Sequence, residues 1–428
     1  MIMRSNINIK PSLKEDKIGL LVLIIILGFA AAVVYHYVIG FYLGKPWPAN
    51  TFLHTPEAHF WDFTLVVRQS AALDPFATDI GGFAGAPFAQ FIGYLFSIIK
   101  ATWLQLCIFF GSFFVVLILM AKHYLYGLKS TLTSHQLLAL FAITFLTYPV
   151  LFAVDRANFA LLVCALLLLF ALTYGSQKYK ASTVFLALAV AIKLYPAIFI
   201  VVYILDKKYK DALLVIFYAA FLTALSLSLF KDGFFLETHK YLNALFNTTG
   251  YLSAGNQQAF NSDLYGLLTV VIQFVGNRLG SEIYLPAHPE ARIFYAILAI
   301  IVFIYFVIYL WKKHLPLWQV LAVLTILVIL LPFNSADYHL TYLLVPTLMY
   351  LGFKEPTRNE LLIIILLGLL FIPKNYYTLQ SFQNIGVVIN PLLLIGLLIS
   401  VIPGAFSIKG IISVFRFGAT VIPAKEQI

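Results

Sequence analysis

Long apolar segments, each about as long as a bilayer is thick, constrain this chain more than any other feature. Residues 18–40, 103–121, 291–311 and 317–333 are almost free of charged side chains, and roughly 20 apolar helical residues cross the hydrocarbon core of a membrane. Only 11% of the 428 residues are charged and 62% are hydrophobic, whereas soluble domains carry roughly 25% charged residues. The sequence therefore predicts an all-α polytopic membrane protein with about 10–13 transmembrane helices.

Lys and Arg residues are distributed unevenly between alternate loops. The run at residues 18–40 is too long for a signal peptide and has no small-residue cleavage site, so we expect it to be the first span. With the N-terminus in the cytoplasm, 18 of the 28 Lys and Arg residues fall on the inner side and 11 of the 18 acids on the outer side. This positive-inside pattern explains the net charge of +10 without a nucleic-acid partner. We expect a multi-pass cell-membrane protein, surrounded by a lipid bilayer, with both termini cytoplasmic.

The chain shows no boundary between domains. It has no Gly-rich phosphate loop, dinucleotide fingerprint or Pro- or Ser-rich linker, and no residues with the spacing of metal ligands. We therefore expect a single transmembrane domain over residues 1–428, without a cofactor or metal. Its first outer loop is expected at about residues 41–90 and a second long outer segment at about residues 231–290.

The segment "ALAVAIKLYPAIFIVVYIL" contains a lysine and a proline inside an apolar stretch. Pro196 breaks a helix, and Lys-rich loops flank both ends of the segment, so we expect a broken pair of short helices around Lys193 rather than one full crossing. Such breaks occur at membrane depth where they line a protein or water-filled cavity. A lysine there is costly unless it faces a cavity and binds an anion or reaches the interface. We interpret Lys193 as a binding residue for a lipid phosphate.

Several polar residues are predicted to lie on the same outer side as this break. Asp62 follows Trp61 at the start of an apolar stripe, which indicates a helix lying in the membrane interface. Asp62 is either a helix cap or solvated acid, or a general base. Arg68, later in the same stretch, is a candidate binding residue.

Three further clusters supply candidate substrate-binding residues. In "DRAN", Arg156 suits a phosphate as a planar fork, and Asn158 either binds substrate or caps the following helix. The amides of "GNQQ" suit sugar hydroxyls, and "NSADYH" places an acid and an imidazole two residues apart. The candidates in these last two clusters are Asn256, Gln257, Asp337 and His339.

The chain resembles glycosyltransferase family 87, which includes polyprenol-phosphate-mannose-dependent mannosyltransferases of actinobacteria. The segments "WDFTLVVRQSAALDPFA", "DRANFALLVCALLLLFAL", "AIKLYPAIF", "GNQQAFNSDLYGLL" and "SADYHLTYLLVP" occur in the family's order. The resemblance covers roughly residues 60–350, and it depends mostly on the order of these short motifs.

The resemblance implies a GT-C fold, an external active site and a polyprenyl-phosphate sugar donor. Asp62 matches the family's catalytic base, Lys193, Tyr195 and Pro196 match its K-x-Y-P element, and His339 matches the last histidine of its SWxHH element. The chain departs from the family where "DRAN" replaces the usual GQxN. It departs again where Ala336 and Tyr338 replace the tryptophan and first histidine of SWxHH.

These features together favour an inverting membrane glycosyltransferase. An enzyme facing outward has no access to cytoplasmic nucleotide sugars, so a lipid-phosphate sugar, with mannose as the favoured sugar, is the expected donor. The expected acceptor is a glycolipid or a glycan of the cell envelope. The alternative is a transporter or flippase for a lipid-linked or anionic substrate, because a broken helix with a buried lysine also occurs in secondary transporters.

Overall fold

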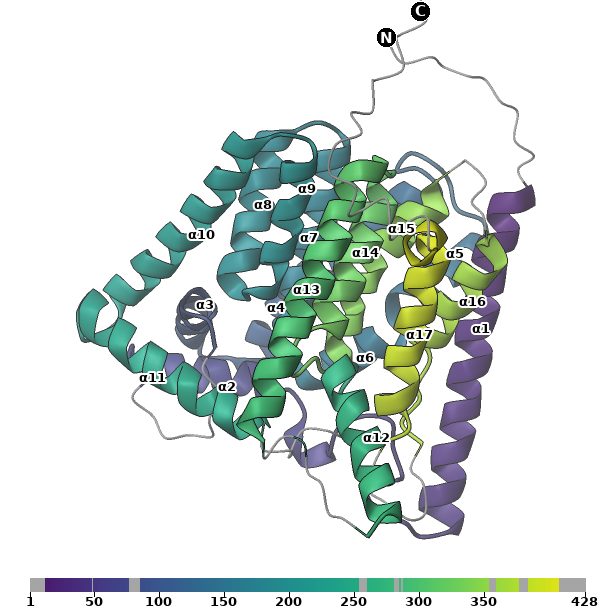
Figure 1. Cartoon of the computed structure of the whole chain (residues 1–428), viewed down its shortest axis with the longest axis horizontal. Helices are drawn as coiled ribbons and strands as arrows, with labels where there is room; N and C mark the ends of the chain where they lie inside the picture. The colour runs from purple at the N-terminus through teal and green to yellow at the C-terminus, as the bar shows by residue number, and fades with distance from the viewer. Residues whose placement is uncertain are drawn as a thin grey trace, which may run out of the picture.

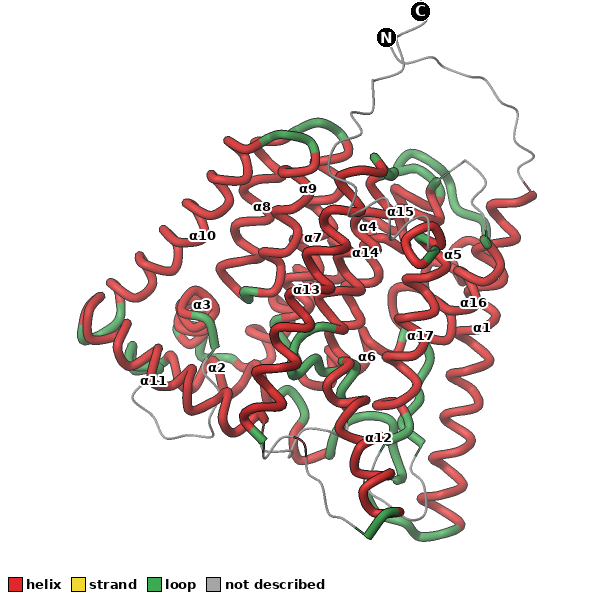
Figure 2. The backbone as a smooth tube through the Cα atoms, viewed as in Figure 1, coloured by secondary structure: helices red, strands yellow, loops and turns green. Residues whose placement is uncertain are grey.

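The computed structural model describes residues 12–47, 49–76, 85–253, 260–280, 285, 288–353, 359–376 and 384–407. Within these residues the chain folds into 17 α-helices. Figure 2 shows the described part of the backbone as helices joined by loops. The described part contains no β-sheet, and its β pairing is limited to one isolated bridge between Asn261 and Ala336. The predicted all-α fold is confirmed.

The helices vary widely in length. In chain order, the α-helices and the two 3₁₀ helices used below are α1 (Ser12–Tyr37), α2 (Trp61–Ser70), α3 (Pro87–Ser97), α4 (Thr102–Leu125), α5 (Ser134–Phe145), α6 (Tyr148–Arg156), α7 (Ala160–Gly175), α8 (Tyr179–Ile192), η3 (Tyr195–Phe199), α9 (Ile200–Leu205), α10 (Tyr209–Leu229), α11 (Gly233–Ser253), α12 (Leu264–Arg278), α13 (Pro289–Lys313), α14 (Leu317–Leu330), η6 (Asp337–Leu343), α15 (Leu344–Gly352), α16 (Glu360–Phe371) and α17 (Gly386–Val401).

Four helices in the described residues are long and apolar enough to cross a membrane alone. They are α1 extended to Tyr42, α4, α10 and α13, and the pair α5 and α6, which bends by 51°, can form a fifth span. The remaining apolar helices have 10–17 residues, shorter than the roughly 20 that a full crossing needs. Short helices are stable at membrane depth when protein encloses their ends, and α14 is buried along almost its whole length. The chain is thus a multi-pass membrane protein.

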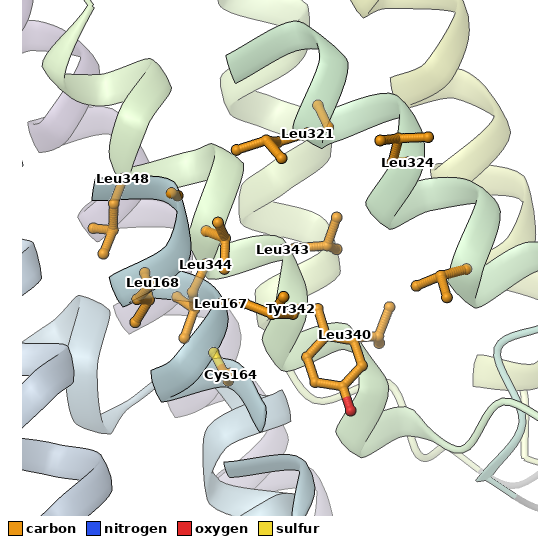
Figure 3. Packing of buried hydrophobic residues seen from close by; sticks show 14 of the residues in the cluster. Cys164, Leu167, Leu168, Leu321, Leu324, Leu340, Tyr342, Leu343, Leu344 and Leu348 are labelled. Atoms are coloured by element: carbon orange, nitrogen blue, oxygen red, sulfur yellow. The ribbon is translucent and has the colours of Figure 1, made fainter. Parts of the chain in front are cut away.

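Helices from distant parts of the sequence form the core of the bundle. Figure 3 shows α7, η6, α14 and α15 packing their apolar side chains against one another. Cys164 of α7 is buried in this cluster as a free thiol. The packing fixes η6, the short helix that carries the predicted site residue His339. In Figure 1, α2 and α12 lie toward the end of the bundle opposite the start of α1.

The predicted helix break around Lys193 is confirmed. Helix α8 ends at Ile192, Lys193 is extended, and the chain resumes as η3 with Pro196 in its first turn. Near the other end of the pair, the hydroxyls of Ser182 and Tyr203 lie 2.6 Å apart. Because these two residues are almost equidistant in sequence from Lys193, α8 and α9 form an antiparallel hairpin. Lys193 is at its tip.

Close packing of α3 against α2 fixes the helix that carries Asp62. A Cβ atom on Gly93 of α3 would lie 2.7 Å from Cγ1 of Val66 and 2.9 Å from Oγ of Ser70, both on α2. On Gly111 of α4, an added Cβ would meet no atom within 4 Å.

We predict that Gly93→Ala lowers both thermal stability and turnover, because overpacking costs about 1–3 kcal/mol and must displace α2. Gly111→Ala is the matched control and is expected to behave like the wild type. A thermal-shift measurement of both variants in detergent checks this, and a Gly93→Ala variant as stable and active as the Gly111→Ala control would contradict it.

Candidate active site

The start of α2 is held by a single acidic residue of α6. The Oδ2 atom of Asp155 accepts a hydrogen bond from the His54 backbone N–H at 3.0 Å, and Oδ1 accepts one from Nδ1 of His59 at 2.5 Å. The carbonyl oxygen of Asp155 accepts a third from the Phe60 N–H at 2.7 Å. Phe60 has a φ of 56°, in the left-handed region, so the chain turns sharply before entering α2. Asp155 therefore sets the position from which α2 begins.

Asp62, the second residue of α2, contacts both polar side chains that follow Asp155 in the DRAN motif. Arg156 donates from Nη2 to Oδ1 of Asp62 at 2.5 Å, and Asn158 donates from Nδ2 to Oδ2 at 2.6 Å. The Asp62 and Arg156 side chains keep 17% and 14% of their surface exposed. The carboxylate is thus oriented by two donors and still reachable by a substrate.

Asn158 joins Asp62 to Lys193. Its Oδ1 accepts a hydrogen bond from Nζ of Lys193 at 2.7 Å and another from the Ala160 N–H at 2.8 Å. An amide facing a carboxylate on one side and an ammonium on the other must present N–H to the first and oxygen to the second. Asn158 therefore caps the start of α7 and also contacts the two charged candidates, Asp62 and Lys193.

Aromatic residues enclose Lys193 from the side of η6. Its Nζ lies 4.8 Å from the centre of the Tyr338 ring, a cation–π distance. The His339 ring contacts Tyr195 with centroids 5.1 Å apart and Tyr338 at 4.6 Å. Nδ1 of His339 lies 3.2 Å from Oγ of Ser335. Nε2 of His339 is buried without a hydrogen-bond partner among the described residues.

The structure brings six of the ten predicted site residues together: Asp62, Arg156, Asn158, Lys193, Tyr195 and His339. Arg68 is exposed near the end of α2, and Asn256 and Gln257 lie outside the described residues.

Asp337 faces away from this cluster. It is 1% exposed and accepts hydrogen bonds from Tyr148 at 2.9 Å, Ser262 at 2.6 Å and Asn390 at 3.1 Å. These donors come from α6, the segment before α12, and α17. The Asp337 network therefore ties η6 to the rest of the bundle.

Two histidines that precede Asp62 were missed by the analysis of the sequence. The stretch "HTPEAHFWD" places His54 and His59 eight and three residues before the acid, and both are held by Asp155. Burial lowers the pKa of His54 to about 4. The positive charge of Arg156 also lowers this pKa, whereas the negative charge of Asp62 raises it. His54 is consequently neutral at pH 7. The signal in the sequence that could have identified them is the position of two histidines shortly before the predicted base.

One group of acids in the described residues has the arrangement of metal ligands. The carboxylates of Asp74, Asp232 and Glu237 lie within 4.8 Å of one another. Nζ of Lys240 donates a hydrogen bond to all three, so the lysine ammonium occupies the position that a metal ion would take. This cluster links the segment that follows α2 to α11.

We predict that Asp155→Ala lowers the turnover number about tenfold or more, because Asp62, the base predicted from the sequence, would lose its alignment with the substrate. Asp155→Asn retains one carbonyl oxygen for the 54–60 segment and is expected to recover part of the activity. Steady-state kinetics of both variants check this, with thermal stability measured in parallel. If activity in the two variants only follows their stability, Asp155 has no positioning role.

The fold and this cluster define a multi-pass helical membrane protein with a charged, partly exposed site at the tip of a short helix hairpin. The sequence profile of glycosyltransferase family 87 matches residues 80–332, which is more than half of the chain. The chain belongs to glycosyltransferase family 87 and is a membrane glycosyltransferase.

No curated protein and no solved structure gives a significant match. The matched residues include Arg156, Asn158 and Lys193 but neither Asp62 nor His339.

Proposed function

We propose that this protein transfers a hexose, with mannose as the favoured sugar, from a polyprenyl-phosphate donor to a cell-envelope glycan or glycolipid. Transfer takes place on the outer face of the cytoplasmic membrane. The observation that carries the proposal is the chain of hydrogen bonds from Asp62 through Asn158 to Lys193. These bonds place a carboxylate and an ammonium on either side of one amide. The reaction requires both groups, because it takes a proton from the acceptor and releases a phosphate from the donor.

In the proposed reaction, Asp62 is the general base. It takes the proton from the acceptor hydroxyl as that oxygen forms a bond to C1 of the sugar. The bond from C1 to the phosphate oxygen breaks on the opposite face, and the polyprenyl phosphate leaves with the bonding electrons. The configuration at C1 is therefore inverted. Arg156 and Asn158 orient the carboxylate, which they contact directly.

Lys193 binds the donor phosphate and stabilises its charge as it departs. Two exposed residues beside it support access from the lipid: Leu194 is 76% exposed and Tyr195 is 39% exposed. A polyprenyl chain can contact these apolar groups while its phosphate reaches Lys193. His339 completes this side as an orienting residue, because its unpaired Nε2 is available for a hydrogen bond to the donor.

The proposal is tested with the full chain in nanodiscs, supplied with polyprenyl-phosphate mannose and a lipid extract as acceptor. We expect loss of the donor and appearance of a mannosylated product with inverted anomeric configuration, and slower reaction with polyprenyl-phosphate glucose. Failure to consume any polyprenyl-phosphate sugar would contradict the proposal. A solute flux across proteoliposomes that does not depend on donor would favour the transporter instead.

A further inference from the structure

A row of aromatic rings leads from the surface to the candidate active site. Trp47, in the outer segment before α2, contacts His54 with ring centroids 5.7 Å apart, and His54 contacts Phe260 at the same distance. Phe260 stacks on Phe152 of α6 at 5.1 Å, and Phe152 stacks on Tyr338 at 6.4 Å. Tyr338 is the ring beneath Lys193. The rings come from four separate segments of the chain, so packing alone brings them together.

The outer end of this row lies beside the carboxylate that we propose as the base. The His54 backbone is bonded to Asp155, the residue before Arg156, and the charges of Arg156 and Asp62 both act on the His54 ring. Lys193 reaches Asp62 from the other direction, through Asn158. The donor phosphate is assigned to the Lys193 side, which leaves the His54 side for the acceptor.

The chemistry of this end fits an uncharged sugar ring. Trp47 is 39% exposed, and an aromatic face that is partly open binds the C–H face of a pyranose. His54 carries no charge at pH 7, and its buried Nδ1 has no hydrogen-bond partner within the described part of the chain. A neutral imidazole both donates and accepts hydrogen bonds, as hydroxyl groups do. Aromatic walls with a few polar atoms are typical of small-molecule sites.

We propose that Trp47, His54 and Phe260 form the acceptor subsite, and that the acceptor presents a neutral sugar ring to it. The assignment rests on the proposed function, since it takes Asp62 as the base and the Lys193 side as the donor site. On this assignment the ring stacks on Trp47 and directs one hydroxyl toward Asp62. His54 holds a second hydroxyl and so selects the orientation in which the ring reacts.

The subsite is tested first without any donor, by saturation-transfer NMR of methyl α-mannopyranoside with the full chain in nanodiscs. We expect the ring protons of the sugar to receive saturation from the wild type, and at least several-fold less from Trp47→Ala. Trp103→Ala is the matched control, because Trp103 of α4 is also exposed, at 69%, and lies outside the row. Glycerol, a polyol without a ring, is expected to receive none.

Equal saturation from wild type and Trp47→Ala, or equal saturation of glycerol and the mannoside, would overturn the subsite. A saturation loss in Trp103→Ala as large as in Trp47→Ala would also overturn it, because it would indicate a general effect at the membrane surface. These outcomes do not depend on transfer activity. Failure of the wild type to use a polyprenyl-phosphate sugar would count against the proposed function alone.

The second test separates the roles of the His54 ring and its nitrogens during transfer. His54→Phe keeps an aromatic ring in the row and His54→Gln keeps a hydrogen-bonding group. We expect both to raise the acceptor KM about tenfold, the scale of one lost aromatic or hydrogen-bonding contact. The donor KM is expected to stay within about twofold of the wild type. A parallel rise in both KM values, or an unchanged acceptor KM in both variants, would contradict the assignment.

Discussion

Replacing Asp62 with asparagine is expected to reduce sugar transfer by about 10²–10⁴-fold, the usual effect of losing a general base. The amide has nearly the same shape as the carboxylate but cannot take a proton at neutral pH. Donor binding is expected to remain close to the wild-type level, because Lys193 contacts Asn158 rather than Asp62 directly. Transfer rates and donor affinities, measured on the same nanodisc preparation, check both expectations.

Asp74→Asn is the matched control for this experiment. Asp74 lies just after α2, the helix that carries Asp62, and its side chain is 18% exposed, against 17% for Asp62. It also bonds a cation, Lys240, at 2.7 Å, but it lies outside the candidate site. We expect Asp74→Asn to retain most of its activity. Similar losses in the two variants, or near-normal turnover by Asp62→Asn, would remove the assignment of Asp62 as the base.

Lys193→Ala is expected to weaken donor binding and turnover together. The same ammonium group would meet the phosphate in the bound donor and in the departing product, and losing a hydrogen bond to a charged group costs about 10–100-fold. Lys193→Met, which keeps the length of the side chain without its charge, is expected to be equally poor. Lys193→Arg is expected to retain part of the activity, because its charge survives while its planar fork fits a compact pocket less well.

The exposed Lys231, between α10 and α11, supplies a control in which a surface charge is removed. Lys231→Ala is expected to bind donor and turn over normally. Binding of polyprenyl-phosphate mannose to each variant is measured alongside transfer. Unchanged donor affinity in Lys193→Ala would exclude the phosphate site, and loss of a donor-independent solute flux in that variant would favour a transporter.

The family match covers only some of the residues that the proposed function uses. Lys193 and Arg156 lie within the residues that match glycosyltransferase family 87, whereas Asp62 and His339 lie outside them. Membership in the family therefore leaves the base unassigned. Measurements on Asp62 variants test an assignment that depends on the geometry around this carboxylate.

The sequence determined the class of protein and the place where its helices break. In a bilayer, apolar runs of this length are stable only where the backbone satisfies its own hydrogen bonds, so the composition predicts helices. Pro196 lacks a backbone N–H and cannot continue α8, so the break beside Lys193 was predictable from a few adjacent residues. These predictions succeeded because each depends on local chemistry.

Tertiary structure alone decided which residues meet at the site. Asp62 lies 94 residues from Arg156 and 96 from Asn158, and no periodicity in the sequence relates positions so far apart. Asp337 and His339 were predicted together because only one residue separates them. On a 3₁₀ helix with three residues per turn, side chains two positions apart point in directions about 120° apart.

Asp337 therefore joins the buried network of Tyr148 while His339 contacts Tyr195 beside Lys193. The role of Asp155 also required the fold. Its hydrogen bonds go to residues about 100 positions earlier in the chain, and that packing positions Asp62. Local chemistry thus sets which helices form and where they end, whereas the contacts between distant helices decide which polar side chains share a site.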